Sequence, residues 1–362
     1  MKKIILLTLL LISIKSFSQE KQIIVSVNKN VEFAAFLCWL VDFGKSYEEG
    51  TNKLNWNKQK FQIHTYNNFK KYNEDSLLET FKKINRNEGL SSYIWLFAQL
   101  DDFPNAKLNN KISSDDYISY DDELSVDEKR EITKKALSEL NKFYKKINFD
   151  KFVSDNKLLY QSIINDVKSN LPDKSFLEQM ESFYNQYDKN SFILNPSLLI
   201  PSGMGFGPTL NNNIYNFFGS FGGVDIENNV TNFNDKGSIL TFTTHEFGHS
   251  FVNHIIDEVN EDYINNTKYL FEPIKASMSK QGYNNWKICL YEHFVRAGEI
   301  ILSSNLGDKK GSDYLFEHHV VKNDFIYIPI ILKHLNYYNH NKDKISYKES
   351  VENAIIDIKN YR

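Results

Sequence analysis

The chain has 362 residues, of which 41% are hydrophobic and 25% are charged. This composition is typical of a globular protein with one large core or two smaller ones, and it argues against disorder. The net charge is −3 and no basic stripe is interleaved with aromatic residues, so nucleic acid is not expected as a partner.

Residues 1–18 have the features of a secretory signal peptide. Two lysines precede an apolar run from Ile4 to Ile14, and the small-x-small tripeptide Ser16-Phe17-Ser18 follows. The alternative is a membrane anchor, but an apolar run of about 11 residues is shorter than the roughly 20 that a transmembrane helix needs. No later segment is apolar for long enough either. We therefore expect an exported protein, periplasmic or extracellular, without an integral membrane segment after cleavage.

The mature part, 19–362, is interpreted as one catalytic unit. Its first section, 19–190, is predicted to be mainly helical after a short strand at 21–27, and 113–128 is predicted to be a loop rich in Asp, Ser and Glu. The predicted helices, where apolar residues recur at spacings of three and four, are 31–43, 91–100, 126–147, 156–170 and 174–188.

The middle section, 191–257, contains strands and then a helix. Runs of β-branched and aromatic residues predict strands at 191–201 and 213–224, with the glycine-rich segment "SGMGFGPTLNN" between them. No Lys-Ser/Thr follows these glycines, so a phosphate-binding loop is not indicated. Turn formation or a close backbone approach to a ligand remain the alternatives for them. A helix is predicted at 237–257.

The last section, 258–362, is predicted to begin with a polar connector that reaches residue 282. A long amphipathic helix follows at 283–306, and apolar stretches at 324–338 and 347–360 complete the chain. The whole pattern predicts an α+β fold in which helices dominate. Cys38 and Cys289 are the only cysteines. An oxidising compartment permits a disulfide between them, and two buried free thiols are the equal alternative.

The segment "THEFGH" places His245 and His249 four residues apart. On a helix this step turns about 40° and rises about 6 Å, so both imidazoles stand on one face and reach the same metal ion. Zinc takes nitrogen, sulfur and carboxylate ligands and leaves a position for water in catalytic sites. Glu246 then has the place of a general base. The alternative is an exposed polar stripe on an ordinary surface helix.

A zinc site needs a third protein ligand. His254 lies on the opposite face of the predicted helix, and Asp257 lies too far along it. The metzincin pattern requires a histidine at position 255, where this chain has Ile255. The third ligand therefore has to come from another element.

The next long helix offers Glu292 and Glu299. They are seven residues apart with Arg296 between them, so all three lie on one stripe and helix phase does not choose the ligand. The carboxylate that does not bind the metal, or Arg296, would orient the one that does. The alternative is a solvated ladder of salt bridges.

The segments "THEFGHSFVN" and "YEHFVRA" resemble the zincin metallopeptidases of the gluzincin type, whose third ligand is a glutamate on a following helix. More narrowly, they are similar to a domain-of-unknown-function family of secreted bacterial proteins with an HEFGHSF helix and a later E-x-x-V-R-A helix, and "VNKNVEFAAFLCWL" resembles that family's opening. The resemblance implies a zincin-like fold with a small sheet before the HExxH helix. It also implies Glu292 as the ligand, with Glu299 outside the matched positions. Glu292 is farther from His249 than in well-studied gluzincins, which an insertion at 258–282 would explain.

Zincins commonly add an extended peptide to an edge strand that precedes the metal helix, and both predicted strands are candidates for that edge, as is a role in the core. An oxyanion also needs a donor besides zinc. The candidates are Tyr291, His293, His318, His319 and Tyr327, each of which is also a common packing or surface residue.

The resulting hypothesis is a secreted zinc metallopeptidase that hydrolyses peptide or protein substrates through a zinc-bound water. His245, His249 and Glu292 are the predicted Zn²⁺ ligands, and Glu246 is the predicted general base. The alternatives are a zincin-like binding module without hydrolysis and a zinc hydrolase that acts on a non-peptide bond. The sequence does not predict the oligomeric state.

Overall fold

The computed structural model describes residues 21–51, 53–73, 80, 89–113, 124–189, 191–228 and 230–360. The predicted signal peptide lies outside these residues, as does most of the predicted loop at 113–128. Within the described part, none of the helices combines the length and apolar character needed to cross a membrane.

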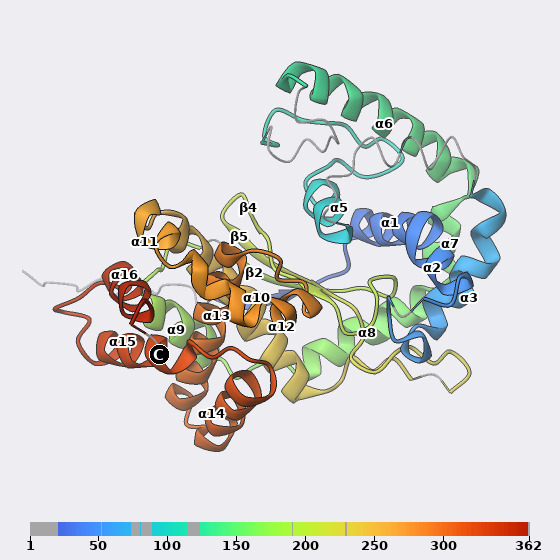
Figure 1. The fold of residues 1–362 in the computed structure, drawn as a ribbon. Coiled ribbons are helices and arrows are strands. Elements are labelled where there is room, and N and C mark those ends of the chain that lie inside the picture. Colours follow the sequence, from blue (N-terminus) through green and yellow to red (C-terminus); the bar gives the residue numbers. More distant parts are fainter. Residues whose placement is uncertain are drawn as a thin grey trace, which may run out of the picture.

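Helices form the first section, as expected, and the described ones between residues 29 and 155 gather at one end of the molecule (Figure 1). The last helix of the section, Ser175–Tyr184, lies instead beside the later helices, where Tyr184 stacks on Phe251. The predicted helix at 31–43 is an α-helix that continues as a π-helical turn over Trp39–Phe43. Phe33 is fully buried and contacts the rings of Phe103, Tyr144 and Phe149 from three later segments, so aromatic packing holds this end together. The α-helices are α1 (Lys29–Cys38), α2 (Gly44–Glu48), α3 (Lys60–Phe69), α5 (Leu90–Phe97), α6 (Val126–Lys146), α7 (Phe149–Asp155), α8 (Lys157–Ser169) and α9 (Ser175–Tyr184).

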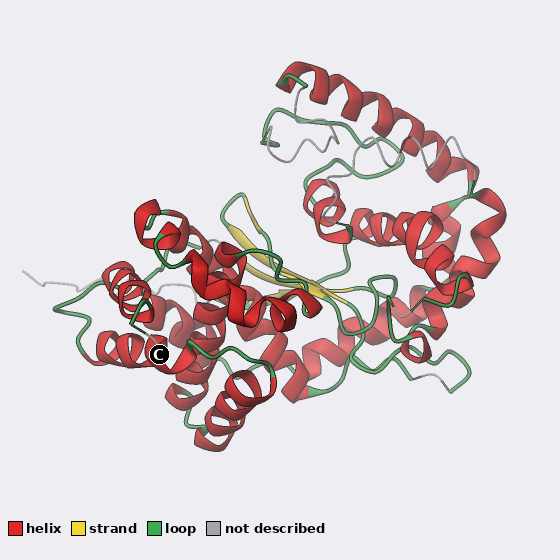
Figure 2. Cartoon of the chain, in the orientation of Figure 1, coloured by secondary structure: helices red, strands yellow, loops and turns green. Residues whose placement is uncertain are grey.

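A small mixed sheet lies between the helices of the N-terminal end and those of the last section (Figure 2). Its strands are β1 (Ile23–Val25), β2 (Ser191–Pro196), β3 (Gly205–Phe206), β4 (Thr209–Leu210) and β5 (Asn213–Phe218). β2 pairs in parallel with β1 on one side and with β5 on the other, and β3 and β4 both pair antiparallel with β5.

The sheet differs from the expectation in two respects. The two predicted strands end earlier, at Pro196 and Phe218. Both are interior strands, so of the two alternatives left open for them, a sheet edge and a role in the core, they have the second. The glycine-rich segment between them is not only a loop, because it folds back on β5 as β3 and β4. Two-residue strands give too short a periodic pattern to be recognised from sequence.

The last section is mainly helical, and the predicted polar connector at 258–282 contains short helices. The predicted small sheet before the HExxH helix and the helical C-terminal half are both present, which makes the fold a helix-dominant α+β fold. The elements are α10 (Lys236–Asp257), α11 (Glu261–Asn265), a 3-10 helix (Lys268–Ile274), α12 (Lys275–Lys280), α13 (Trp286–Asn305), α14 (Lys309–Phe316), a π-helix (Glu317–Lys322), α15 (Ile328–His340) and α16 (Tyr347–Ile358).

α10 is fixed between the sheet and α13. The ring of Phe247 packs on Phe192 of β2, with 5.3 Å between the ring centroids. On the α13 side, a Cβ added to Gly248 would lie 3.1 Å from Cγ1 of Val295. A side chain at position 248 would therefore require Val295 to move by a few tenths of an ångström, and the glycine between the two histidines favours the close approach of the two helices.

Cys38 and Cys289 are both buried and unpaired. Of the two alternatives for the cysteines, the structure therefore has the two buried free thiols.

Candidate metal centre

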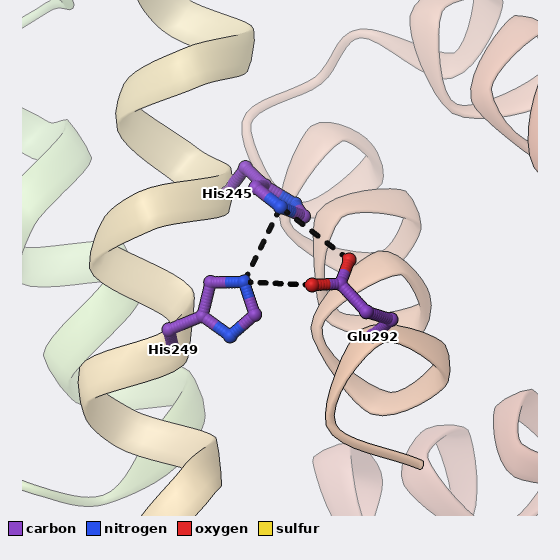
Figure 3. A group of neighbouring side chains, drawn as sticks. All are labelled: His245, His249 and Glu292. Atoms are coloured by element: carbon purple, nitrogen blue, oxygen red, sulfur yellow. Dashed lines mark hydrogen bonds and ion pairs between the residues drawn. The ribbon is translucent and has the colours of Figure 1, made fainter. Parts of the chain in front are cut away.

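The HExxH helix places both of its histidines on one face, as the spacing predicts. Asp235 caps the start of α10 by accepting a hydrogen bond from the backbone N–H of Ser238. The Nε2 atoms of His245 and His249 face each other across 3.3 Å (Figure 3). Two nitrogen ligands in a tetrahedral zinc site, each at 2.0–2.1 Å from the ion, lie about 3.3 Å apart.

α13 brings Glu292 to the same point (Figure 3). Its Oε1 lies 3.3 Å from Nε2 of His249, and its Oε2 lies 3.6 Å from Nε2 of His245. Ligand atoms of the three residues all lie within 4.8 Å of one another, so they form a group that could hold a metal ion. Glu292 is buried, and both histidine side chains are largely buried.

The far side of each imidazole fixes which nitrogen carries the proton. Nδ1 of His245 donates to Oε1 of Glu299 at 2.5 Å, and Nδ1 of His249 donates to Oδ1 of Asn253 at 3.1 Å. With the proton held on Nδ1, a neutral imidazole presents the lone pair of Nε2 to the shared point. Such a partner on the second nitrogen is the usual support of a metal-binding histidine.

The shared point is therefore rich in acceptors. Among the described residues, no hydrogen bond is made to the buried Oε2 of Glu292, whose contacts are an ion pair with Arg296 and the approach to Nε2 of His245. Burial alone would raise the pKa of Glu292, but His249, His245 and the guanidinium of Arg296 hold it well below the usual range. An ionised carboxylate beside two imidazole lone pairs is a donor set that fits a divalent cation such as zinc.

Protons and metal compete for this point. Burial by itself lowers the pKa of His249, but the charge of Glu292 and a hydrogen bond to it raise the pKa to about 9. Without a metal, this pKa keeps the imidazole protonated at neutral pH, and a bound metal ion would displace the proton.

Glu299, the second glutamate of α13, does not orient Glu292, which we expected of it or of Arg296, but contacts two histidines. Glu299 binds His245 with Oε1, and its Oε2 accepts a hydrogen bond from Nε2 of His319 at 2.8 Å. Both Glu299 and His319 are buried. Of the two glutamates that helix phase does not separate, Glu292 lies at the shared point and Glu299 lies behind His245.

Arg296 takes the orienting role that the stripe suggested. Its Nη2 lies 3.3 Å from Oε2 of Glu292 and donates to the hydroxyl of Tyr283 at 3.0 Å. Its guanidinium also lies over the ring of Phe325, 4.6 Å from the centroid. Glu292 and Glu299 are buried and the side chain of Arg296 is only 16% exposed, so the stripe is not a solvated salt-bridge ladder.

Glu246 is buried under the start of the glycine-rich hairpin. A Cβ added to Gly205 would lie 3.0 Å from Oε1 of Glu246, and one added to Gly207 would lie 2.8 Å from its Oε2. Glycine at these two positions is what lets the backbone of β3 pass so close to the carboxylate. Burial raises the pKa of Glu246, the charge of the two histidines opposes this, and the charge of Glu292 adds to it.

Most of the oxyanion candidates are engaged elsewhere. The hydroxyl of Tyr291 donates to Asp257, and that of Tyr327 donates to the carbonyl of Leu270. Nδ1 of the buried His293 donates to the carbonyl of Cys289 at 2.7 Å. Of the five candidates, His318 lines a cavity beside Arg296 and Glu299, and His319 is the partner of Glu299. His254 is exposed and lies outside the group, in agreement with its helix phase.

Three contributors were not predicted in their roles. Asn253 could have been found from its position four residues after His249, since this spacing places both on one helix face. His319, which binds Glu299, lies in a π-helical turn, and Tyr283, which binds Arg296, follows a short helix. Such short segments have no helical periodicity that could be recognised in the sequence.

Residues 23–358 match the model of a protein family described as "Domain of unknown function (DUF4932)". The searches among curated proteins and solved structures found no match. The matched segment includes α10 and α13 and covers most of the chain, as the resemblance to a family of unknown function led us to expect. The chain therefore belongs to the DUF4932 family.

Proposed function

We propose that the protein is an exported zinc metallopeptidase of the gluzincin type. The observation that carries the proposal is the group itself. The Nε2 atoms of His245 and His249 are 3.3 Å apart and face one point together with the buried carboxylate of Glu292. On the other side of each imidazole, Glu299 or Asn253 accepts a hydrogen bond from Nδ1. Zinc at this point would supply a Lewis acid that polarises a substrate carbonyl and acidifies a water molecule.

Glu246 is the proposed general base. It follows His245 directly on α10, is buried, and has a raised pKa, so it is suited to accept a proton from the attacking water and to return it to the leaving amine. Arg296 keeps the carboxylate of Glu292 in place, and Glu299 keeps the imidazole of His245 in place.

The sheet supports a peptide as the substrate. Among the described strands, β3 pairs with β5 alone and its backbone passes over Glu246. An extended peptide can add to a free strand edge through main-chain hydrogen bonds. This edge, rather than β2 or β5, is the proposed position for a scissile segment near the base.

The test compares the wild-type protein with Glu246→Gln after zinc loading. We expect one zinc ion per chain in both, and a rate of peptide cleavage that falls about 10²- to 10⁴-fold in the variant, because a general base contributes this much. Glu258→Gln is the matched control, since Glu258 is an exposed carboxylate at the end of the same helix.

Two results would contradict the proposal. A wild-type rate of peptide cleavage by Glu246→Gln would show that Glu246 is not the general base. Zinc binding without cleavage of any peptide by the wild type would favour a binding module or a hydrolase for another bond.

A further inference from the structure

Two cavities lie next to the group of His245, His249 and Glu292. They differ in whether the charged residues on their walls have partners of opposite charge. One is lined by Arg296 and Glu299, whose charges are matched by Glu292 and His245. The other, here called the Lys189 cavity, has a volume of about 560 Å³ and is lined by Lys189, His249 and Asn253, together with β4 and Trp95 of α5. A ligand in the Lys189 cavity would therefore lie against one of the proposed metal ligands.

Lys189 is a buried cation without a close partner. Its side chain is 8% exposed, and the nearest carboxylate oxygen that pairs with its Nζ is Oδ2 of Asp188, at 3.9 Å. Asp188 is itself 65% exposed, so its attraction is screened by water. The ring of Phe251 lies 6.0 Å from Nζ, which gives a weak cation–π contact. Removing an ammonium from water is costly unless an anion and hydrogen bonds compensate for it.

The only acidic residue on the described wall of the Lys189 cavity does not compensate. Asp257 is held by Lys287, 2.5 Å from its Oδ1, and by the hydroxyl of Tyr291. Lys111 adds a second positive charge at the wall, and no ion pair joins it to another described residue. Burial and the charge of Lys189 lower the pKa of His254, which also lines the cavity. The described wall is thus positively charged, and none of its described residues supplies a matching anion.

We propose that the Lys189 cavity is a subsite for a carboxylate of the substrate, with the ammonium of Lys189 as its partner. The choice of a peptide as the carrier of this carboxylate rests on the proposed function. Two sources have the same chemistry: the C-terminal carboxylate of a peptide, and the side chain of an aspartate or glutamate near the scissile bond. Because His249 and Lys189 line the same cavity, a carboxylate bound there would belong to the same substrate that reaches the metal group, so its charge selects the substrate.

The experiment measures binding without turnover. The zinc-loaded Glu246→Gln protein is titrated into fluorescently labelled octapeptide pools of mixed sequence, and fluorescence anisotropy reports the affinity. One pool has a free C-terminus and no acidic residue, one is its C-terminal amide, and a third is an amidated pool that contains Asp and Glu. The free-acid pool tests the C-terminal source, and the third pool tests the side-chain source.

At least one carboxylate-bearing pool should bind about 10- to 100-fold more tightly than the neutral amide, because a hydrogen bond to a charged group is worth this factor. Lys189→Met should abolish the difference and leave the affinity for the neutral pool unchanged. Lys189→Arg keeps the charge and should retain the preference. Lys142→Met is the matched control, since it removes an exposed lysine that pairs only with Glu139 on α6.

The fold is checked by thermal unfolding of each variant. Methionine resembles lysine in volume and carries no charge, so Lys189→Met should keep or raise the melting temperature. If this variant fails to fold, Lys189→Gln replaces it in the same titration.

Equal binding of acidic and neutral pools, absence of binding by every pool, or a preference that survives Lys189→Met would each overturn the inference. The proposed function is tested separately by cleavage. A protein that binds acidic peptides through Lys189 but hydrolyses none would refute the peptidase and keep the subsite.

Discussion

Two helices of this protein bury glutamates in opposite electrostatic surroundings. On α1, Glu32 is 1% exposed, its Oε2 accepts a hydrogen bond from the hydroxyl of Tyr160, and no cation pairs with it among the described residues. On α13, Glu292 and Glu299 are equally inaccessible, but Arg296 and three imidazoles surround them. Burial raises the pKa of Glu32 to about 7, whereas the pKa values of the α13 pair lie well below the usual range.

The difference shows what distinguishes a candidate metal centre from a buried acid. A carboxyl group without a cation is kept neutral by its surroundings and serves packing. A carboxylate that is held ionised, with histidine lone pairs beside it, keeps a negative charge available for a metal ion. The predictions below change residues either around the glutamates of α13 or at Glu32 of α1.

The largest effect is expected for the proposed ligand itself. Glu292→Gln should lower zinc affinity by more than about 100-fold, the upper range for a residue that supports a ligand from behind. Glu299→Gln, on the same face of α13, should lower it by only about 10- to 100-fold, because Glu299 acts through His245. Competition with a chromophoric chelator measures both. A larger loss in Glu299→Gln would reverse the assignment of the two residues.

Glu32→Gln tests the buried carboxyl of α1 through the pH dependence of the free energy of unfolding. The folded protein holds a proton on Glu32 between pH 4.5 and about 7 that the unfolded chain has lost, so this residue makes stability fall as pH rises through that window. The loss is on the order of 3 kcal/mol. The neutral variant should lack this fall and be more stable relative to wild type at pH 8 than at pH 5.

Urea unfolding at several pH values measures the effect of Glu32→Gln. Glu139→Gln, an exposed change on α6, is the control and should leave the pH dependence as in the wild type. Parallel pH curves for wild type and Glu32→Gln would show that the buried carboxyl does not titrate as described.

The smallest effect is expected at Asn253. Its amide oxygen holds Nδ1 of His249 through a neutral hydrogen bond, whereas Glu299 holds His245 through a charge-assisted one. Asn253→Ala should therefore weaken zinc binding by about 10-fold, near the lower limit for such partners. The same chelator competition applies. A loss as large as that of Glu292→Gln would place Asn253 among the ligands.

Much of this arrangement follows from local rules. Helix periodicity predicts α10 and α13, and the four-residue step predicts that His245 and His249 share a face. Periodicity does not choose between Glu292 and Glu299, because the choice depends on where α13 crosses α10, and that is a matter of tertiary packing such as the contact of Gly248 with Val295. The hairpin of β3 and β4 and the contribution of His319 depend on tertiary packing of very short or π-helical segments, so the sequence pattern did not predict them.

The central claim is that His245, His249 and Glu292 hold one zinc ion. It is tested most directly by the zinc content of the mature protein after zinc loading and gel filtration, beside the double variant His245→Ala/His249→Ala. We predict one zinc ion per chain in the wild type and none in a folded double variant. A wild type that retains no zinc, or a double variant that retains it in full, would contradict this account.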